Sequence, residues 1–314
     1  MPTSTDSMLE PRFMGVPTFM RTPFQPDPTG LDIAMLGVAY DGGVTNRPGT
    51  RHGPRDLRDK SSMMRTIHHV TRLNPYAICS IADIGDVPLT GMYDPPTVVA
   101  EIEAFVARVK SAGALPLTAG GDHSITYPIL KALAKDGPVG LIHVDAHTDT
   151  WDSFQGSQLA HGAPFRRAHD DGLIDAARTI QIGIRGAQNS PEGWDYSKNS
   201  GMRVMFMEEV SRIGIDAVIA EARALVGDGP VYLSFDIDSL DPVYAPGTGT
   251  PEVGGLTVIE AQALLRGLRN LNYIGADLVE VAPPFDQTGN TALVGATLMY
   301  EILCLMAESI NERR

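Results

Sequence analysis

Three apolar segments of the chain each lead into acidic and histidine residues, and this pattern limits the folds that the chain can adopt. The segments cover residues 114–117, 141–144 and 231–235, and each has the length and apolar character of a buried strand. The side chains that follow these segments are His123, Asp145, His147, Asp149, Asp236 and Asp238. Alternate residues of a strand share a face, so acidic residues spaced two apart can converge on one point. Strands that end side by side in a parallel sheet would bring all of these groups to one edge.

These side chains are suited to hold two divalent cations. Carboxylates packed together repel one another unless a cation neutralises them, and four negative charges balance two divalent ions. Oxygen-rich ligation with some imidazole favours Mn²⁺ over Zn²⁺, and no cysteine stands among these residues. Each motif alone is weakly specific, since a single Asp-x-Asp is more often a turn or a helix cap. Together at three strand ends, the motifs predict a site for two Mn²⁺ ions per chain.

Apolar segments of strand length alternate with amphipathic segments along the chain. We expect strands near residues 32–39, 78–82, 114–119, 138–144, 178–184, 203–207, 230–236 and 273–281. We expect helices over residues 97–112, 124–134, 215–225, 257–268 and 291–309. This alternation predicts an α/β domain of three α/β/α layers, with a mostly parallel eight-stranded sheet. Residues 31–314 are therefore expected to form a single catalytic domain, and the Pro-rich residues 1–30 an extended arm on the body or on a neighbouring subunit.

Composition indicates a soluble enzyme. A net charge of −13 argues against a nucleic-acid partner, which requires a basic surface. Cys79 and Cys304 provide no disulfide framework, and both lie in apolar segments. The N-terminus lacks the pattern of a signal peptide, and we expect no apolar run of membrane-spanning length. The chain is therefore expected to be cytoplasmic, with no membrane partner.

The chain resembles the ureohydrolase family, which includes arginase, agmatinase and the guanidino-acid hydrolases. The resemblance rests on the segments GGDHS at 120–124, DAHTD at 145–149, SFDIDSLD at 234–241 and APGTGTP at 245–251. It extends from about residue 11 to residue 305 and is strongest toward the bacterial agmatinase, guanidinopropionase and guanidinobutyrase branch. It implies an arginase-like fold, hydrolysis of a guanidino group to urea and an amine, and assembly into a homotrimer or homohexamer.

The resemblance also implies a role for each ligand. Asp145 and Asp236 would bridge the two ions. His123 and Asp149 would complete one ion, and His147 and Asp238 the other. His143 lies two residues before Asp145 and therefore on the same face of the strand, but it is farther from the strand end. We interpret it as a supporting histidine rather than a ligand.

Three residues are expected to act in catalysis. Asp149 would accept a hydrogen bond from the nucleophilic hydroxide. Glu280 matches the family glutamate that holds the guanidinium, and a carboxylate fits the paired N–H groups of a planar cation. His161 matches a family histidine proposed to transfer protons, a task that imidazole suits near pH 7. Each of the last two has a simpler alternative interpretation. Glu280 could form a salt bridge with an arginine, and His161 could be a solvated loop residue.

The substrate is harder to predict. The loop at 150–160 supplies Trp151, Ser153 and Gln158 as candidate substrate-binding residues. The amine end of agmatine needs a carboxylate or polar cap, whereas a guanidino acid needs a donor such as arginine. Because arginines are frequent in the N-terminal third and residues 46–55 resemble guanidinopropionase, we favour guanidinopropionate or guanidinobutyrate over agmatine.

Two alternatives belong to other functional classes. A non-catalytic oligomeric or regulatory member of the same fold would be expected to have lost metal ligands, and all of them are present in the sequence. An amide hydrolase of the deacetylase type on a related fold generally uses one zinc ion, which does not match a ligand set for two.

Overall fold

A single parallel sheet forms the centre of the protein. The computed structural model describes residues 8–314. Its strands are β1 (Ile33–Val38), β2 (Ile81–Asp86), β3 (Leu115–Gly120), β4 (Val139–Val144), β5 (Ile174–Ile184), β6 (Arg203–Phe206), β7 (Val231–Asp236) and β8 (Tyr273–Val279). Their order across the sheet is β2-β1-β3-β8-β7-β4-β5-β6, and every pair is parallel. The predicted eight-stranded sheet is confirmed, and it is parallel throughout.

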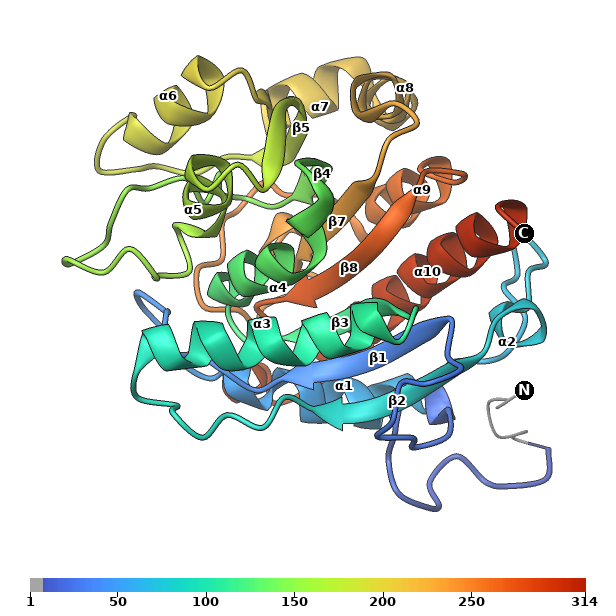
Figure 1. Ribbon diagram of the computed structural model, residues 1–314. Coiled ribbons are helices and arrows are strands. Elements are labelled where there is room, and N and C mark those ends of the chain that lie inside the picture. The colour runs from blue at the N-terminus through green and yellow to red at the C-terminus, as the bar shows by residue number, and fades with distance from the viewer. Residues whose placement is uncertain (1–7) are drawn as a thin grey trace.

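Helices cover both faces of this sheet and complete the predicted three layers. They are α1 (Gly53–Ser61), α2 (Pro75–Ile78), α3 (Pro95–Ser111), α4 (Thr126–Leu133), α5 (Pro164–Asp170), α6 (Glu192–Asn199), α7 (Met207–Ile213), α8 (Ile215–Val226), α9 (Val258–Gly267) and α10 (Asn290–Glu312). Figure 1 shows α3 and α4 on one face of the sheet and α1 and α10 on the other. Neighbouring strand residues face opposite layers: Met35 belongs to the apolar cluster that contains α10, and Leu36 to the cluster that contains α3.

The second strand lies later in the chain than expected. We expected a strand near residues 78–82, but β2 begins at Ile81 and residues 75–78 form the short helix α2. Asn74 caps this helix, because its side chain accepts a hydrogen bond of 3.1 Å from the backbone N–H of Tyr76. A proline at the first helical position also favours the helix over the strand.

The C-terminal helix α10 departs from the expectation that no apolar run reaches membrane-spanning length. It is long enough and apolar enough to cross a membrane by length and composition, with a mean hydropathy of 1.6. Within the fold, however, 72% of its apolar window is buried. Helix α10 packs against α1 and α9, so its apolar surface is used in the core of the protein.

The described part of the N-terminal segment, residues 8–30, is attached to the sheet by a short turn at residues 19–21 and by backbone hydrogen bonds of Pro23 and Gln25 with Asp83 of β2. Phe19 and Met20 belong to the main apolar cluster and are fully buried or nearly so. The backbone N–H of Phe19 donates to Asp83 at 3.0 Å, and the guanidinium of Arg58 lies 4.2 Å from the centre of the Phe19 ring. Large apolar side chains before this turn are exposed, among them Phe13 at 89%.

The two phenylalanines allow a matched test of this attachment. Phe19→Ala should destabilise the fold by about 3–5 kcal/mol, because it leaves a cavity in a packed core. Phe13→Ala should change stability by less than about 0.5 kcal/mol, because its ring is exposed. Urea-unfolding midpoints of both variants provide the measurement, and equal shifts would show that the turn at Phe19 does not anchor the segment.

Candidate metal centre

A glycine turn after β3 brings the first histidine to the edge of the sheet. The backbone N–H of Gly121 donates to Val38 at 2.8 Å, and that of Asp122 donates to Tyr40 at 2.8 Å. A Cβ atom at Gly121 would lie 2.0 Å from the carbonyl oxygen of Tyr40, so no larger residue fits this approach to the end of β1. The turn therefore delivers His123 beside the ends of the neighbouring strands.

The acidic residues come from the ends of β4 and β7, which are adjacent in the sheet. Asp145 follows the last residue of β4, and Asp236 is the last residue of β7. The Asp236 carboxylate accepts the backbone N–H of Asp238 at 2.8 Å, which forms the turn that returns Asp238 to the site. Asp149 has a left-handed backbone with φ of 49°, a strained conformation for a residue with a side chain.

The predicted ligands meet in two groups that share one carboxylate. In the first group, Nδ1 of His123 lies 3.0 Å from Oδ2 of Asp145, 3.0 Å from Oδ2 of Asp149 and 3.1 Å from Oδ2 of Asp236. In the second group, Nδ1 of His147 lies 3.4 Å from Oδ1 of Asp145 and 3.2 Å from Oδ2 of Asp238. The structure thus brings together all of the side chains that the motifs predicted to bind metal.

The chemistry of this cluster fits two cations. Nδ1 of His123 is buried and makes no hydrogen bond within residues 8–314, although three carboxylates surround it. Burial first, and then repulsion from Asp238 and Asp145, raises the pKa of Asp236 well above its usual range. Burial also raises the pKa of Asp238. Acidic groups in this arrangement require either protons or cations, and the inward-facing imidazole nitrogens favour cations.

His143 lies within reach of a cation held by His123 and Asp145, but its hydrogen bonds are those of a residue that orients a ligand. Its Nε2 lies 2.7 Å from Oδ2 of Asp145, and its Nδ1 lies 3.1 Å from the amide nitrogen of Gln181. That nitrogen also donates to the carbonyl oxygen of Thr148 at 2.6 Å, so it is the donor side of the amide. Nδ1 of His143 therefore accepts, and the ring proton on Nε2 is directed at Asp145. This arrangement supports the interpretation that His143 orients a ligand.

A buried relay of hydrogen bonds holds His123 from behind. Nε2 of His123 lies 2.8 Å from Oγ of Ser234, and this hydroxyl donates to Asp277 at 2.6 Å. The other carboxylate oxygen of Asp277 accepts from the hydroxyls of Thr126 at 2.6 Å and Tyr232 at 2.8 Å. Partners of this kind fix the orientation of a ligating imidazole.

Glu280 and His161 form a pair beside the cluster. Nδ1 of His161 lies 2.7 Å from Oε1 of Glu280, which also accepts the backbone N–H of His123 at 2.9 Å. Oε2 of Glu280 is buried and has no hydrogen-bond partner in the described chain. Glu280 also has a left-handed backbone, with φ of 65°. Burial would lower the pKa of His161, but the Glu280 carboxylate outweighs it and raises this pKa to about 9.

A cavity of about 630 Å³ opens over the cluster. Its wall includes His147, Asp149, Asp236, Asp238 and His161, together with the predicted residues Trp151 and Ser153. Gln158, by contrast, is exposed and lies outside the wall, where Gln155 takes the expected position. A tight turn between Phe154 and Ser157, with two backbone hydrogen bonds of 2.8 and 2.9 Å, directly precedes Gln158, and the cavity wall resumes only at Ala160.

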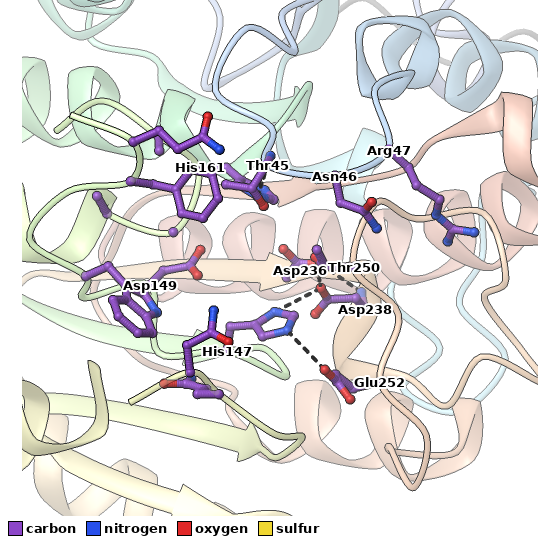
Figure 2. A pocket seen from close by; sticks show the side chains of 18 of the residues that line it. Thr45, Asn46, Arg47, His147, Asp149, His161, Asp236, Asp238, Thr250 and Glu252 are labelled. Carbon is purple, nitrogen blue, oxygen red and sulfur yellow. Dashed lines mark hydrogen bonds and ion pairs between the residues drawn. The ribbon is translucent and has the colours of Figure 1, made fainter. Parts of the chain in front are cut away.

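Further cavity residues were not identified from the sequence. Thr45, Asn46 and Arg47 lie along one side of the cavity in Figure 2, and Glu252 lies on the opposite side with the acidic cluster between them. The first three belong to the connection that follows β1. Their position beyond the carboxyl end of a strand in a parallel sheet was the signal that could have indicated them.

The fold and the site together define a binuclear metal centre at the carboxyl edge of a parallel sheet. Residues 31–305 match the Arginase family, and the chain belongs to that family.

Similar proteins cover nearly the whole chain. The chain is 52% identical over 309 residues to a guanidinopropionase from Pseudomonas aeruginosa, covering 98% of this chain and 97% of the relative. It is 48% identical to a mitochondrial agmatinase from Gallus gallus, covering 98% of this chain and 89% of the relative. Its structure is similar to proclavaminate amidino hydrolase from Streptomyces clavuligerus, with a TM-score of 0.90 and 37% identity over 96% of this chain and all of that one.

The relay behind His123 allows a test of the metal centre. Ser234→Ala should lower the affinity for one of two divalent ions by about 10- to 100-fold, because the imidazole loses the partner that orients it. Ser309→Ala is the matched control, since this buried serine lies on α10 and its hydroxyl donates to Leu271. Metal content after dialysis against graded chelator measures the difference, and full retention in Ser234→Ala would show that the relay is not part of the site.

Proposed function

We propose that the protein hydrolyses a short guanidino acid, such as guanidinopropionate or guanidinobutyrate, to urea and the corresponding amino acid. The observation that carries this proposal is the buried Oε2 of Glu280, which has no hydrogen-bond partner within residues 8–314 and lies beside a cluster suited to two cations. Membership of the Arginase family and the identity to a guanidinopropionase support it. A non-catalytic role has no support from the site, because every expected ligand is present and in place.

In this proposal the cations are Mn²⁺, and each ligand has a defined place. His123 and Asp149 would hold one ion, His147 and Asp238 would hold the other, and Asp145 and Asp236 would be available to both. When bound, two such ions act as Lewis acids and provide a strong nucleophile from water near neutral pH.

Glu280 would bind the reacting group. A guanidinium presents parallel N–H donors, and the buried Oε2, which has no partner within residues 8–314, can accept one of them. The strained backbone of Glu280 is held by its N–H donating to Gly121 at 2.9 Å, on the same turn that presents His123. The carbon to be attacked is thereby held close to the ligand cluster.

His161 and Asp149 would handle the protons. Both line the cavity, so both can reach a substrate or a water within it. Asp149 accepts a hydrogen bond from the attacking water and orients it. His161 supplies the proton that the departing amine nitrogen requires for the carbon–nitrogen bond to break.

Arg47 would bind the carboxylate at the far end of a guanidino acid. Its guanidinium donates to the backbone oxygens of Thr248 and Gly249 and lies 4.4 Å from the ring centre of Phe285. It pairs with no carboxylate within residues 8–314, and it lines the cavity. A cation without a counter-ion at the wall favours an anionic substrate end.

Agmatine is a second candidate because Glu252 also lines the cavity. An ammonium group could pair with this carboxylate. However, Glu252 already lies 4.0 Å from Nε2 of His147, and that neighbour lowers its pKa. Glu252 is thus directed toward a ligand of the metal centre, which makes it less available to a substrate than Arg47.

We also propose that the chain forms a homotrimer or homohexamer. Met63, Ile67 and Val70, in the connection between α1 and α2, are 49%, 58% and 54% exposed. Large apolar side chains grouped in this way are typical of subunit contacts.

A panel of guanidino compounds tests the reaction. The Mn²⁺-loaded protein should release urea from guanidinopropionate or guanidinobutyrate with a higher kcat/KM than from agmatine, and chelation should abolish the activity until Mn²⁺ is restored. Asp236→Ala should lose both ions, because it removes a ligand shared between them. Colorimetric urea assays with metal analysis provide the measurement. Absence of urea from every compound in the loaded protein would overturn the proposed function.

Arg47→Gln should separate acid from amine substrates. Its kcat/KM for the guanidino acid should fall at least about tenfold, since a hydrogen bond to a charged group contributes roughly 1.5–3 kcal/mol. The value for agmatine should change much less, because agmatine carries no carboxylate. The ratio of the two values, measured in the same preparation, is the readout. A parallel loss on both substrates would mean that Arg47 only holds the backbone at residues 248–249.

A further inference from the structure

Both ring nitrogens of His161 are engaged by the protein. Nδ1 is paired with Glu280, and Nε2 lies 2.8 Å from the hydroxyl oxygen of Thr45 and 3.2 Å from its backbone nitrogen. His161 is only 7% exposed, while Thr45 is partly exposed and lines the cavity. Figure 2 shows the two residues side by side at the cavity wall. Thr45 is therefore the residue that hydrogen-bonds Nε2 of His161 at the cavity wall.

The backbone N–H and the side-chain hydroxyl of Thr45 differ in the hydrogen bonds that they can make. A backbone N–H only donates, so it can bind Nε2 only while that nitrogen carries no proton. The hydroxyl can donate to an unprotonated Nε2 or accept from a protonated one. The hydroxyl alone can therefore remain bonded to His161 before and after a proton transfer.

The segment that carries Thr45 is held in place at several points. The carbonyl oxygen of Gly43 accepts the backbone N–H of His161 at 2.9 Å. The N–H of Gly43 donates to the buried carboxylate of Asp122 at 2.7 Å, within the glycine turn of the metal centre. Farther along, the N–H of Gly49 donates to Asp41 at 2.8 Å. A segment fixed in this way can position a side chain accurately.

We propose that Thr45 is a positioning residue for His161: its hydroxyl bonds Nε2 before and after a proton transfer and holds the imidazole at the orientation from which Nε2, on leaving this bond, gives its proton to the departing amine nitrogen of the substrate. This inference rests on the proposed guanidino hydrolysis, and it adds a residue from the connection after β1 to the groups that serve the reaction. Thr45 acts through His161, and within residues 8–314 its hydrogen bonds go to His161 and not to an expected metal ligand.

Kinetic variants of the Mn²⁺-loaded protein test the proposal. Thr45→Val keeps the branched shape and the backbone N–H but removes the hydroxyl, and kcat should fall about tenfold or more with little change in KM. Thr45→Ser should restore most of kcat, because it keeps the hydroxyl. Thr50→Val is the matched control, since Thr50 is buried and its hydroxyl has no partner in the described chain. All variants should keep two ions per chain.

A double variant tests whether Thr45 acts through His161. In a His161→Asn background, Thr45→Val should cause no further loss of kcat, because the imidazole that it positions is already absent. Equal losses in both backgrounds, or a loss in Thr45→Val that Thr45→Ser does not restore, would overturn the proposal and leave Thr45 with a general structural role.

A spectroscopic measurement separates this inference from the proposed function. Nitrogen-15 resonances of the His161 ring, assigned by their absence in His161→Asn, should shift in Zn²⁺-loaded Thr45→Val and return in Thr45→Ser. They should not move in Thr50→Val. Unchanged His161 resonances in Thr45→Val would overturn the inference. Absence of urea release from the wild-type protein, with these shifts present, would instead overturn only the proposed reaction.

Discussion

Carboxylates buried around two imidazoles cannot all remain ionised without cations, and the rest of the structure follows from this constraint. Asp145, Asp236 and Asp238 are almost completely buried, and their oxygens surround the inward-facing nitrogens of His123 and His147. Without bound cations this cluster would need protons to offset its charge, so metal binding and the stability of the sheet edge are linked. A parallel sheet meets the geometric requirement, because it places the carboxyl ends of distant segments side by side.

Three imidazoles of the site, those of His123, His143 and His161, share one arrangement. In each of them one nitrogen is directed at the cluster or its acidic neighbours, and the other is hydrogen-bonded by a different part of the chain. The partner of this second nitrogen is Ser234 for His123, Gln181 for His143 and Thr45 for His161. The partners of His123 and His143 determine which nitrogen carries the proton, so the protein controls the chemistry of these rings through residues that need not touch a substrate.

The strands and the ligand cluster could be predicted from the sequence because their signals are local. An apolar run followed by acidic residues at alternate positions occupies fewer than ten residues, and it determines both the strand and the side chains at its end. The contact of Thr45 with His161 spans 116 residues, and that of Arg47 with Gly249 spans 202, so neither leaves a pattern in any short window.

The backbone conformation of individual loops also could not be predicted from the sequence. Gln155 adopts a left-handed backbone with φ of 48°, which allows the tight turn that places it in the cavity wall and Gln158 outside. Few residues with side chains take this conformation, so nothing in the sequence favoured Gln155 over Gln158 for the cavity wall. Helix α5 was likewise not expected, because seven residues complete too few turns to show a helical period.

Strand β8 has a consequence for how the protein is made. It lies between β3 and β7 and is the link between two half-sheets, one of β2, β1 and β3 and the other of β7, β4, β5 and β6. Its residues, 273–279, come later in the chain than those of every other described strand. A chain synthesised as far as residue 238 carries every expected metal ligand, yet its two half-sheets have no strand β8 to join them. His123 lies on one half and the acidic ligands on the other, so the ligands come together only after β8 has been made.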